Sequence, residues 1–399
     1  MSVDIQPSHV DQIKQTNIGL VYRLIDQYGP ISRIALSKKS QLAPASITKI
    51  TRELIDAHLV KEAEFPDLSF RGRPAVGLKI DSKGWQFLCI RINKESVVFG
   101  LRDLSNNLRV EEELPFSFSL NQSFLDCIVD EIDDFFFRHQ SCLERLTAIS
   151  ITTNAIIHSS PYYDIQDIPL GTFLHQRTGL PTFLQHGITA WTIAESLYGA
   201  GENCQNLIQI VIDDNVGAGV MTAGQMLHAG NHSVVEIGHT QVDPDGEHCY
   251  CGNTGCLETV VGIKNILVKA HRLAESHPDS LLYSISPLTI DSLCQAANQG
   301  DLLATNIIHD VGERIGRIMA IMVNIFNPEK ILIGSPLNGA QNILYPAIQQ
   351  QIAQLSLPGY SQQVNIVATR FDNTGTLPAA SLIKQSLYSG ELLIELMQG

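Results

Sequence analysis

The sequence predicts an α/β fold in which an N-terminal winged helix-turn-helix precedes a duplicated α/β body. Helical periodicity dominates the first sixty residues, strands alternate with helices from about residue 85, and a second set of strands begins near residue 207. We therefore expect a head over residues 1–80, a first lobe over 81–190 and a second lobe over 191–399, which also carries C-terminal oligomerisation helices.

The head begins with three helical segments. Residues 9–28 place apolar side chains at helical spacing, and Gly29-Pro30 ends that run. Ser32 can cap a second helix, and Pro44 can open a third at its first position. The outward side chains of the third helix are small, hydroxyl-bearing or cationic: Ala45, Ser46, Thr48, Lys49 and Arg52. Such a face suits a helix that enters the DNA major groove.

Two short strands, over residues 59–64 and 75–80, make the head a winged variant. Arg71 and Arg73 flank a glycine between these strands, and a flexible cationic tip can enter a minor groove or bind phosphates. The competing interpretation is a protein-interaction domain with ordinary solvated charges. The outward face of the third helix and the cationic tip together favour binding to double-stranded DNA.

The body is expected to repeat one arrangement of strands and helices. Its elements are, in order, a hairpin over 85–104, a helix over 123–139, a strand over 146–152, a helix over 190–198, a hairpin from 207, a helix over 311–326 and a strand over 330–334. Residues 380–397 read as one amphipathic helix, interrupted by Gly390, that docks on its own body or contributes to a subunit interface.

Composition and charge limit the classes of function. The chain has 399 residues and a net charge of −14, but residues 1–80 contain 11 Lys and Arg against 8 Asp and Glu, a net charge of +3. A basic head can approach phosphate while the acidic remainder is repelled by it. The N-terminus has neither the basic nor the apolar region of a signal peptide, so we expect a cytoplasmic protein.

Four residues at tight spacing predict a metal site: His239, Cys249, Cys251 and Cys256. Three thiolates and one imidazole fill all four positions of tetrahedral zinc, which is typical of a structural site, so we expect one zinc ion per chain. Free thiols remain an alternative, and His248 competes with His239 as the fourth ligand. The other cysteines are expected to be core residues: Cys89, Cys127, Cys142, Cys204 and Cys294.

Four motifs carry a resemblance to a known family: VVEIGHT, the CYCGNTGCLE that follows it, the hairpin NVGAGV and the late KILIGSPL. Together they resemble the ROK family of repressors and sugar kinases, and the winged helix in front resembles its repressor branch. The resemblance implies an actin-like, sugar-kinase-type body with a structural zinc. It also implies dimers or tetramers that bridge the two half-sites of an inverted-repeat operator and repress genes of sugar uptake.

Departures from the family predict that the chain is not an enzyme. Active members have a glycine-rich phosphate turn, whereas Arg91, Asn93, Lys94 and Glu95 occupy the corresponding stretch here. The catalytic Asp of the kinases corresponds to Gly187, which cannot accept a proton. An active sugar kinase remains the alternative.

The input signal is left open by the sequence. Residues matching the sugar-binding residues of the family are present, and with His186 they form a candidate effector pocket: His186, Glu236, His239 and Glu258. Glu236 and Glu258 can instead orient the zinc ligands. After Thr152 a short stretch of the family's loop is absent, either because the loop is truly shorter or because the numbering closes over a gap. Binding of a sugar or sugar phosphate is therefore only one of two inputs to consider.

The other candidate input is a protein. Phe135, Phe136 and Phe137 are consecutive on an expected helix, and consecutive helical residues lie about 100 degrees apart, so the three rings cannot share one core. Either they pack against a neighbouring domain or one is exposed for a partner. By resemblance, repressors of this branch are sequestered at the membrane by the dephosphorylated glucose transporter of the phosphotransferase system.

Overall fold

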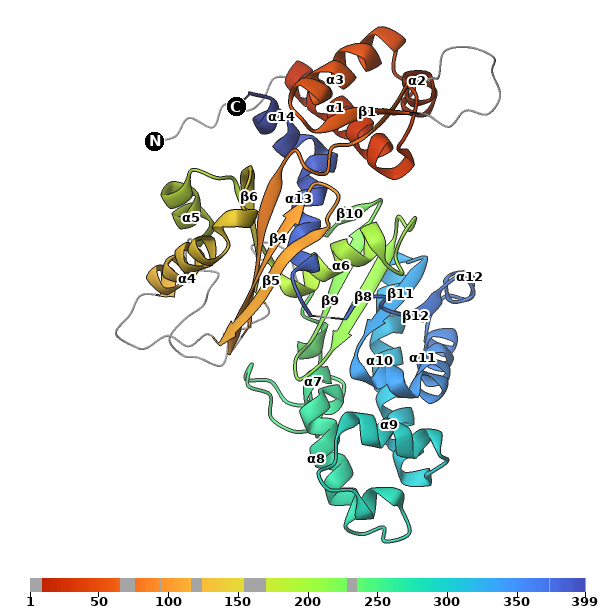
Figure 1. Cartoon of the computed structure of the whole chain (residues 1–399). Coiled ribbons are helices and arrows are strands. Elements are labelled where there is room, and N and C mark those ends of the chain that lie inside the picture. Colours follow the sequence, from red (N-terminus) through yellow and green to blue (C-terminus); the bar gives the residue numbers. More distant parts are fainter. Residues whose placement is uncertain are drawn as a thin grey trace. The chain divides into compact units, whose positions relative to one another are not determined.

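The computed structural model describes residues 9–64, 76–93, 95–115, 124–153, 170–227, 235–372 and 374–398 (Figure 1). The chain forms two compact units, one of residues 1–187 with 375–399 and one of residues 188–374. This differs from the division expected from the sequence, because the C-terminal residues return to the first unit and do not belong to the second lobe.

The head has the expected winged helix-turn-helix. Its elements are α1 (His9–Tyr28), α2 (Arg33–Ser40), α3 (Pro44–Asp56), β1 (Val60–Glu64) and β2 (Val76–Ile80), and the two strands pair antiparallel. The hydroxyl of Ser32 caps α2 by accepting a hydrogen bond from the backbone N–H of Ala35 at 3.2 Å. Gln41 ends α2 in the left-handed conformation, and Pro44 opens α3 at its first turn.

The first unit also contains a five-stranded sheet in the order β5-β4-β3-β6-β7. Its elements are β3 (Gln86–Ile92), β4 (Ser96–Asp103), β5 (Leu108–Pro115), α4 (Phe124–Arg138), β6 (Leu146–Thr153), α5 (Leu170–Thr178) and β7 (Thr182–His186). Leu88 and Ile90 belong to the core cluster shared with α4 and α5, whereas Phe87 and Cys89 belong to a different core cluster. This alternation is the two-residue period of a strand buried on both faces.

The second unit repeats the same strand order, β10-β9-β8-β11-β12. Its strands are β8 (Leu207–Ile212), β9 (Val216–Thr222), β10 (Gln225–Met226), β11 (Lys330–Gly334) and β12 (Asn365–Ala368). Its helices are α6 (Gly187–Tyr198), α7 (Leu257–Val261), α8 (Ile263–Ala274), α9 (Ile290–Asn298), α10 (Leu302–Phe326), α11 (Gln341–Leu355) and α12 (Pro358–Ser361). Two sheets with one topology confirm the expected duplication.

Each sheet is covered by a helix that follows the last strand of the other sheet in the chain. The chain leaves the first sheet at β7, and the following α6 packs on the second sheet, where Thr192 fills the space beside Gly219. The chain leaves the second sheet at β12, and the following α13 (Leu377–Ser389) packs on β3, β6 and β7, where Thr376 fills the space beside Gly100. A Cβ at either glycine would overlap the threonine hydroxyl, so each sheet accepts its helix by a matched glycine-threonine contact.

The head and the body of the first unit share one hydrophobic core. Buried residues of the head helices lie in one cluster with apolar residues of α13, of α14 (Glu391–Gln398) and of the inner face of the sheet. Gly19 of α1 touches the backbone at Tyr388, and Gly390 touches the backbone at Gln15. The expected terminal helix is therefore two helices, divided at Gly390, whose φ of 84° is left-handed.

Candidate functional site

The expected outward face of α3 is exposed. All five side chains predicted to point away from the core are exposed to solvent: Ala45, Ser46, Thr48, Lys49 and Arg52. Ile47, Ile50 and Leu54 are buried on the opposite face at helical spacing. The guanidinium of Arg52 is 83% exposed and makes only a 3.8 Å ion pair with Asp56, so it is free to contact a ligand.

Arg33 fixes the position of α3 and was not identified from the sequence. Its Nε donates a hydrogen bond to the hydroxyl of Thr51 on α3 at 3.1 Å, and its Nη2 pairs with the carboxylate of Glu62 on β1 at 3.0 Å. One side chain of α2 thus ties the recognition helix to the first strand of the wing. The signal was absent from the sequence because Arg33 and Glu62 are 29 positions apart.

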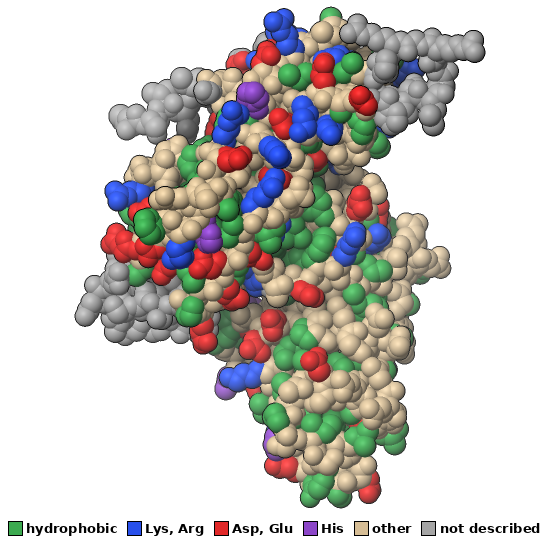
Figure 2. Space-filling model, viewed as in Figure 1, with side chains coloured by type: hydrophobic (Ala, Val, Ile, Leu, Met, Phe, Trp, Pro, Cys, Tyr) green, Lys and Arg blue, Asp and Glu red, His purple; other side chains and the backbone are tan. Residues whose placement is uncertain are grey.

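The strands that carry the wing are present, but its tip lies outside the described residues. Arg71 and Arg73 lie in this tip, so their contacts with DNA stay predictions. The described surface of the head carries Lys and Arg side chains interspersed with acidic ones (Figure 2). The head is therefore mixed in charge, and its candidate DNA contacts rest on the placement of α3.

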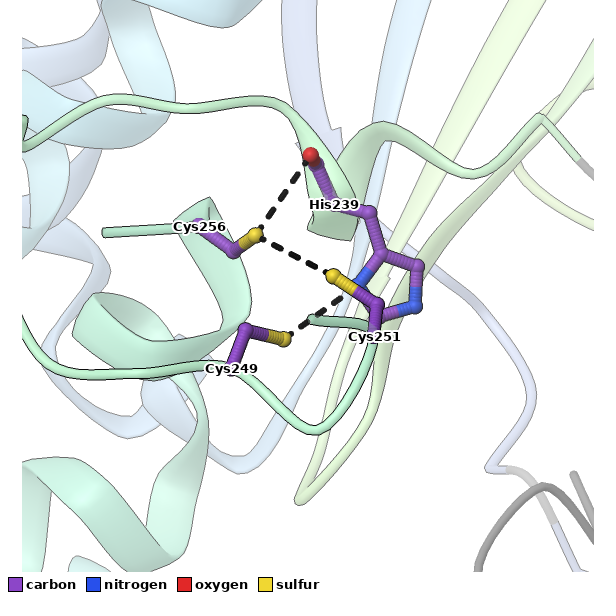
Figure 3. Close-up of side chains that lie close together, drawn as sticks. All are labelled: His239, Cys249, Cys251 and Cys256. Atoms are coloured by element: carbon purple, nitrogen blue, oxygen red, sulfur yellow. Dashed lines mark hydrogen bonds between the residues drawn. The ribbon is translucent and has the colours of Figure 1, made fainter. Parts of the chain in front are cut away.

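The four predicted metal ligands come together in the second unit (Figure 3). The Nδ1 atom of His239 and the three Sγ atoms all lie within 4.8 Å of one another. Cys249 Sγ is 3.5 Å from His239 Nδ1, and Cys251 Sγ is 3.7 Å from Cys256 Sγ. These separations match the distance of about 3.8 Å expected between ligands that each bind zinc at about 2.3 Å. The cluster therefore fits a tetrahedral metal ion.

The loop chemistry explains how a short segment holds four ligands. Gly255 adopts a φ of 64° and touches the backbone of Asp243, so the chain folds tightly between the first and last ligands. Cys256 then precedes α7 and is fully buried, while Cys251 is exposed. His248 stands apart from the cluster, because its Nδ1 is 3.1 Å from the hydroxyl of Thr254. His239 is therefore the fourth ligand candidate.

The three thiols of the cluster differ in how their surroundings shift their pKa. Burial raises the pKa of Cys256 to about 12 and also raises the pKa of Cys249. The pKa of Cys251 is lowered, chiefly by the hydrogen bond from the backbone of Asn253. A bound cation would favour the thiolate form of all three residues. Support for a metal therefore comes from the convergence of the four donor atoms.

Tyr250 and Glu258 surround the imidazole of the cluster. The hydroxyl of Tyr250 is 3.1 Å from His239 Nε2, and Glu258 is buried with its carboxylate accepting the backbone N–H of Val216 at 2.8 Å. Burial and the negative charge of Glu258 raise the pKa of Tyr250, so its phenol remains protonated. Tyr250 was not singled out from the sequence, although its place between two cysteine ligands is a signal that could have found it.

The candidate effector residues divide between the units. Glu236, His239 and Glu258 lie around the loop that carries the four-residue cluster in the second unit, and His186 lies at the carboxyl end of β7 in the first unit. The segment after Thr153, where the sequence leaves the length of the family's loop open, lies outside the described residues. The structure therefore brings three of the four residues together within one unit.

The turn between β3 and β4 lacks the features of a phosphate site. Asn93 closes it by donating from its backbone N–H to the Ser96 carbonyl at 2.8 Å, and its side chain donates to the Ser96 hydroxyl at 3.1 Å. The side chain of Glu95 is exposed at this turn, while Arg91 is buried in β3, and Lys94 lies outside the described residues. A carboxylate at this turn repels a phosphate rather than binding it.

The three phenylalanines of α4 have different environments. Phe135 is buried and stacks on Phe99 with ring centroids 5.3 Å apart, Phe136 is half-buried, and Phe137 is 75% exposed. The expectation that the rings cannot share one core is confirmed. Exposed acids on the same helix accompany Phe137, and acidic side chains gather over this part of the surface (Figure 2): Asp126, Asp130, Asp133 and Asp134.

The remaining cysteines are only partly core residues. Cys89 and Cys294 are buried as expected, and burial raises the pKa of each to about 11. Cys127 and Cys204 are half-buried, and Cys142 is exposed, so the expectation of a core position is wrong for Cys142. Cys142 lies in a short 3-10 turn after α4, where the chain runs over the surface.

Fold and site define a class of protein, a winged-helix head joined to a duplicated sugar-kinase-type body with a Cys3His cluster. The ROK family pattern matches residues 87–386, and this chain belongs to the ROK family. It is 54% identical to the DNA-binding transcriptional repressor Mlc of Escherichia coli K12 over the full length of both chains. It is 35% identical to the dual regulator NagC of the same organism over 98% of both.

A solved structure shares the fold. The crystal structure of a ROK family transcriptional regulator, described as a homologue of the E. coli Mlc protein, matches with a TM-score of 0.88 and 42% identity, covering 98% of this chain and 100% of that one. In the segments of the chain that the structure describes, no helix is both long and apolar enough to cross a bilayer.

Proposed function

We propose that this protein is a DNA-binding transcriptional repressor of genes for sugar uptake and metabolism. The observation that carries the proposal is the exposed face of α3 in a winged helix, in a chain 54% identical over its full length to a repressor. The helix has no acidic residue in its first turn, so its positive end can approach phosphate. Thr48, Lys49 and Arg52 then face base edges or the backbone.

Substitutions on the head test the DNA contacts. Arg52→Ala and Arg71→Ala should each weaken operator binding by about 1–3 kcal/mol. If the arginine that is removed contacts a phosphate, the slope of the logarithm of the binding constant against the logarithm of the salt concentration should also fall by about one. Arg272→Ala is the matched control, because this exposed arginine lies on α8 of the second unit. Unchanged affinity in both head variants would remove the assignment of the interface.

We infer that the body is catalytically inactive. Glu95 is exposed at the turn where kinases of the family bind phosphate, and Gly187 begins α6 at the position of their catalytic base. Neither residue can perform the chemistry of the group that it replaces. The alternative is an active sugar kinase with a DNA-binding head, and sustained consumption of ATP in the presence of glucose or N-acetylglucosamine would establish it.

We propose that the four-residue cluster binds one structural zinc ion per chain. Three cysteines and one histidine complete the coordination and leave no open position for substrate water. The ion would stabilise a loop of turns with little core of its own, and α7 begins directly after its last ligand. Glu258 is bonded to the backbone of Val216, so it supports the neighbouring strand β9 rather than the ion itself.

The inducing signal is proposed to come from a protein, the glucose transporter of the phosphotransferase system. The exposed ring of Phe137 among the acids of α4 supports a docking surface for a domain with an apolar pocket and a basic rim. A sugar or sugar phosphate that binds the candidate effector residues is the alternative. In the first case the transporter protein releases the repressor from its operator, and in the second case the sugar or sugar phosphate does.

A pull-down from glucose-grown cells distinguishes these inputs. The wild type should capture the transporter domain, and Phe137→Asp should lose it because a charge cannot enter an apolar pocket. Leu302→Asp is the control, since Leu302 is 78% exposed on the second unit. If free sugars release the operator and Phe137→Asp captures the transporter as well as wild type, the protein input is excluded.

Assembly into dimers or tetramers on an inverted repeat is part of the proposal. The sequence assigned this role to the C-terminal helices. Leu387, Leu392, Leu393 and Leu396 are buried in the core of their own first unit, so these side chains are covered within the protomer. A subunit interface on these helices would therefore use their other side chains, such as the exposed Glu391 and Glu395 of α14.

A further inference from the structure

A long segment of the second unit carries no charged residue. Residues 331–369 contain no Asp, Glu, Lys, Arg or His, although 17% of the residues in the whole chain are charged. The segment runs from β11 through α11 and α12 to β12. Many of its side chains on α11 and α12 are exposed, so the lack of charge extends to the surface. Figure 2 shows apolar and uncharged side chains over these two helices.

Four exposed apolar side chains gather where α10 meets the end of this segment. Ile321 and Ile325 lie one turn apart on α10, Leu355 ends α11, Leu357 precedes α12, and all four are more than half exposed. The Asn324 side chain joins the two parts, because its amide nitrogen donates to the carbonyl oxygen of Leu355 at 3.3 Å and its amide oxygen accepts the backbone N–H of Leu357 at 2.9 Å. These four apolar residues therefore form one surface, which we call the neutral face.

The two helices that carry the neutral face are packed closely together. A Cβ atom on Gly312 of α10 would lie 2.7 Å from the side chain of Ala347, and one on Gly316 would lie 2.7 Å from that of Gln351. Only glycine therefore allows α11 to approach α10 at this separation. The neutral face is formed before any partner binds, which lowers the entropic cost of binding.

The chemistry of the neutral face narrows the class of partner. Its four side chains offer no cation to a phosphate and no charge to a charged protein, and the nearest charged residues along this part of the sequence are Arg317 and Glu329. Outside residues 1–80 the chain has 16 Lys and Arg against 33 Asp and Glu, a net charge of −17, so two bodies repel each other. In a two-fold contact the same surface of each copy meets itself, so a charge near the axis would meet a like charge. An uncharged apolar surface avoids this repulsion.

We propose that the neutral face is an interface between two copies of this chain. A second copy presents the same apolar, uncharged surface, and pairing the two removes eight exposed aliphatic side chains from water, four from each copy. The inference rests on the assembly that is part of the proposed function, and it names the surface that the buried leucines of α13 and α14 leave open. The contact lies on the second unit, whereas the head belongs to the first.

Charges placed on the neutral face test the inference. Ile325→Glu and Leu355→Glu put an acid on each of the two helices, and Ile325→Lys adds the opposite charge, so that the position can be separated from the net charge. Leu108→Glu is the matched control, because Leu108 is an exposed apolar residue on β5 of the first unit. Sedimentation of the full-length chains without DNA, over a range of protein and salt concentrations, measures their assembly, and thermal unfolding confirms that each variant is folded.

All three variants of the neutral face should sediment as smaller species than wild type at the same concentration, with a dissociation constant raised at least about tenfold, while the control stays like wild type. Added salt should leave the assembly of wild type unchanged or strengthen it, because apolar contact carries it and the repulsion between acidic bodies is screened.

Three results would overturn the inference: a wild type that is monomeric throughout, folded face variants that assemble like wild type, or a control that dissociates as they do. The proposed function is decided separately by the sequence preference of wild type on DNA. A chain that prefers its operator but assembles without the neutral face would keep the function and lose the interface. A chain that assembles through the neutral face but shows no sequence preference would do the reverse.

Discussion

At the scale of single residues, Lys384 joins the head to the body through a buried charge. Its Nζ lies 2.5 Å from the carboxylate of Asp26 on α1 and donates to the carbonyl oxygen of Leu104 at 3.0 Å. The hydroxyl of Tyr388 donates to the same carboxylate. Burial lowers the pKa of Lys384, and the negative charge of Asp26 opposes that change. Helix α1, the end of β4 and helix α13 therefore meet at one ion pair.

Removing one partner of this ion pair should destabilise the folded protein. Lys384→Met leaves Asp26 without its counter-charge, and we expect a loss of about 3–5 kcal/mol in the free energy of unfolding. The double variant Asp26→Leu, Lys384→Met should recover much of this loss, because both charges are then gone. Urea unfolding of these two variants and of the single variant Asp26→Leu measures the three losses. A double variant at least as unstable as the sum of the singles would show that the two charges do not interact.

The residues that sequence reasoning found and missed differ in the range of their contacts. The cluster of His239 and three cysteines and the outward face of α3 follow from spacing along one loop and one helix, so they were predictable. Arg33 contacts Thr51 and Glu62 only because the three head elements pack together. Such a contact depends on tertiary structure, which no local pattern encodes.

At the scale of elements, α10 organises the second unit. It spans 25 residues, and its buried face lies in the largest core cluster with β8, β11 and α11. Asp301 caps its N-terminus, where the carboxylate accepts the backbone N–H of Ala304 at 2.8 Å and that of Leu281 at 2.7 Å. Partial burial acts to raise the pKa of Asp301, but these hydrogen bonds outweigh burial and lower it below 3.8.

The Asp301 cap should make the free energy of unfolding depend on pH in the acid range. A carboxyl whose pKa is lowered on folding contributes stability above its ordinary value near 3.8, and that contribution is lost as the pH falls through its lower, folded value. Asp301→Asn keeps the cap but should remove this dependence, whereas Asp301→Ala should cost about 1 kcal/mol at neutral pH. Thermal unfolding between neutral pH and pH 3 measures both. An unchanged acid dependence in Asp301→Asn would exclude the carboxylate as its source.

Elements with strong local signals were predictable, and the arrangement of the C-terminus was not. Helix α1, the first hairpin and β11 match the expected ranges, and α2 and α3 begin where they were expected, because caps, prolines and periodicity mark them. The expected single helix over 380–397 is instead α13 and α14, broken at Gly390 where the backbone meets Gln15. The residue that forces the break is 375 positions away, so the sequence pattern around Gly390 indicates only an interruption.

At the scale of the whole molecule, the head is part of the first unit rather than a separate module. Its helices share a core with α13 and α14, and α13 starts where the chain re-enters the first unit from the second. Thr376 at that point accepts a hydrogen bond from Arg102 and donates one to Glu111. Helix α13, the first helix after the chain re-enters the first unit, therefore helps to set the position of the head on that unit.

Loss of the metal should affect the second unit first. Cys249→Ser should lower the zinc content from one ion per chain towards none and expose residues 239–256 to proteolysis, because the loop has little core apart from the ion. Cys142→Ser is the control, since Cys142 is exposed and distant from the cluster in sequence. Metal analysis and limited proteolysis measure the two effects. A wild-type chain purified without added chelator that contains no zinc would contradict the metal assignment.

We propose that α3 recognises a specific DNA sequence and that the body of the chain is catalytically inactive. The most direct measurement is the affinity of the purified chain for genomic fragments that it selects, compared with scrambled duplexes of equal length at one salt concentration. We predict binding at least about a thousandfold tighter to the selected fragments, lost on Arg52→Ala. Equal affinity for selected and scrambled DNA would contradict the account.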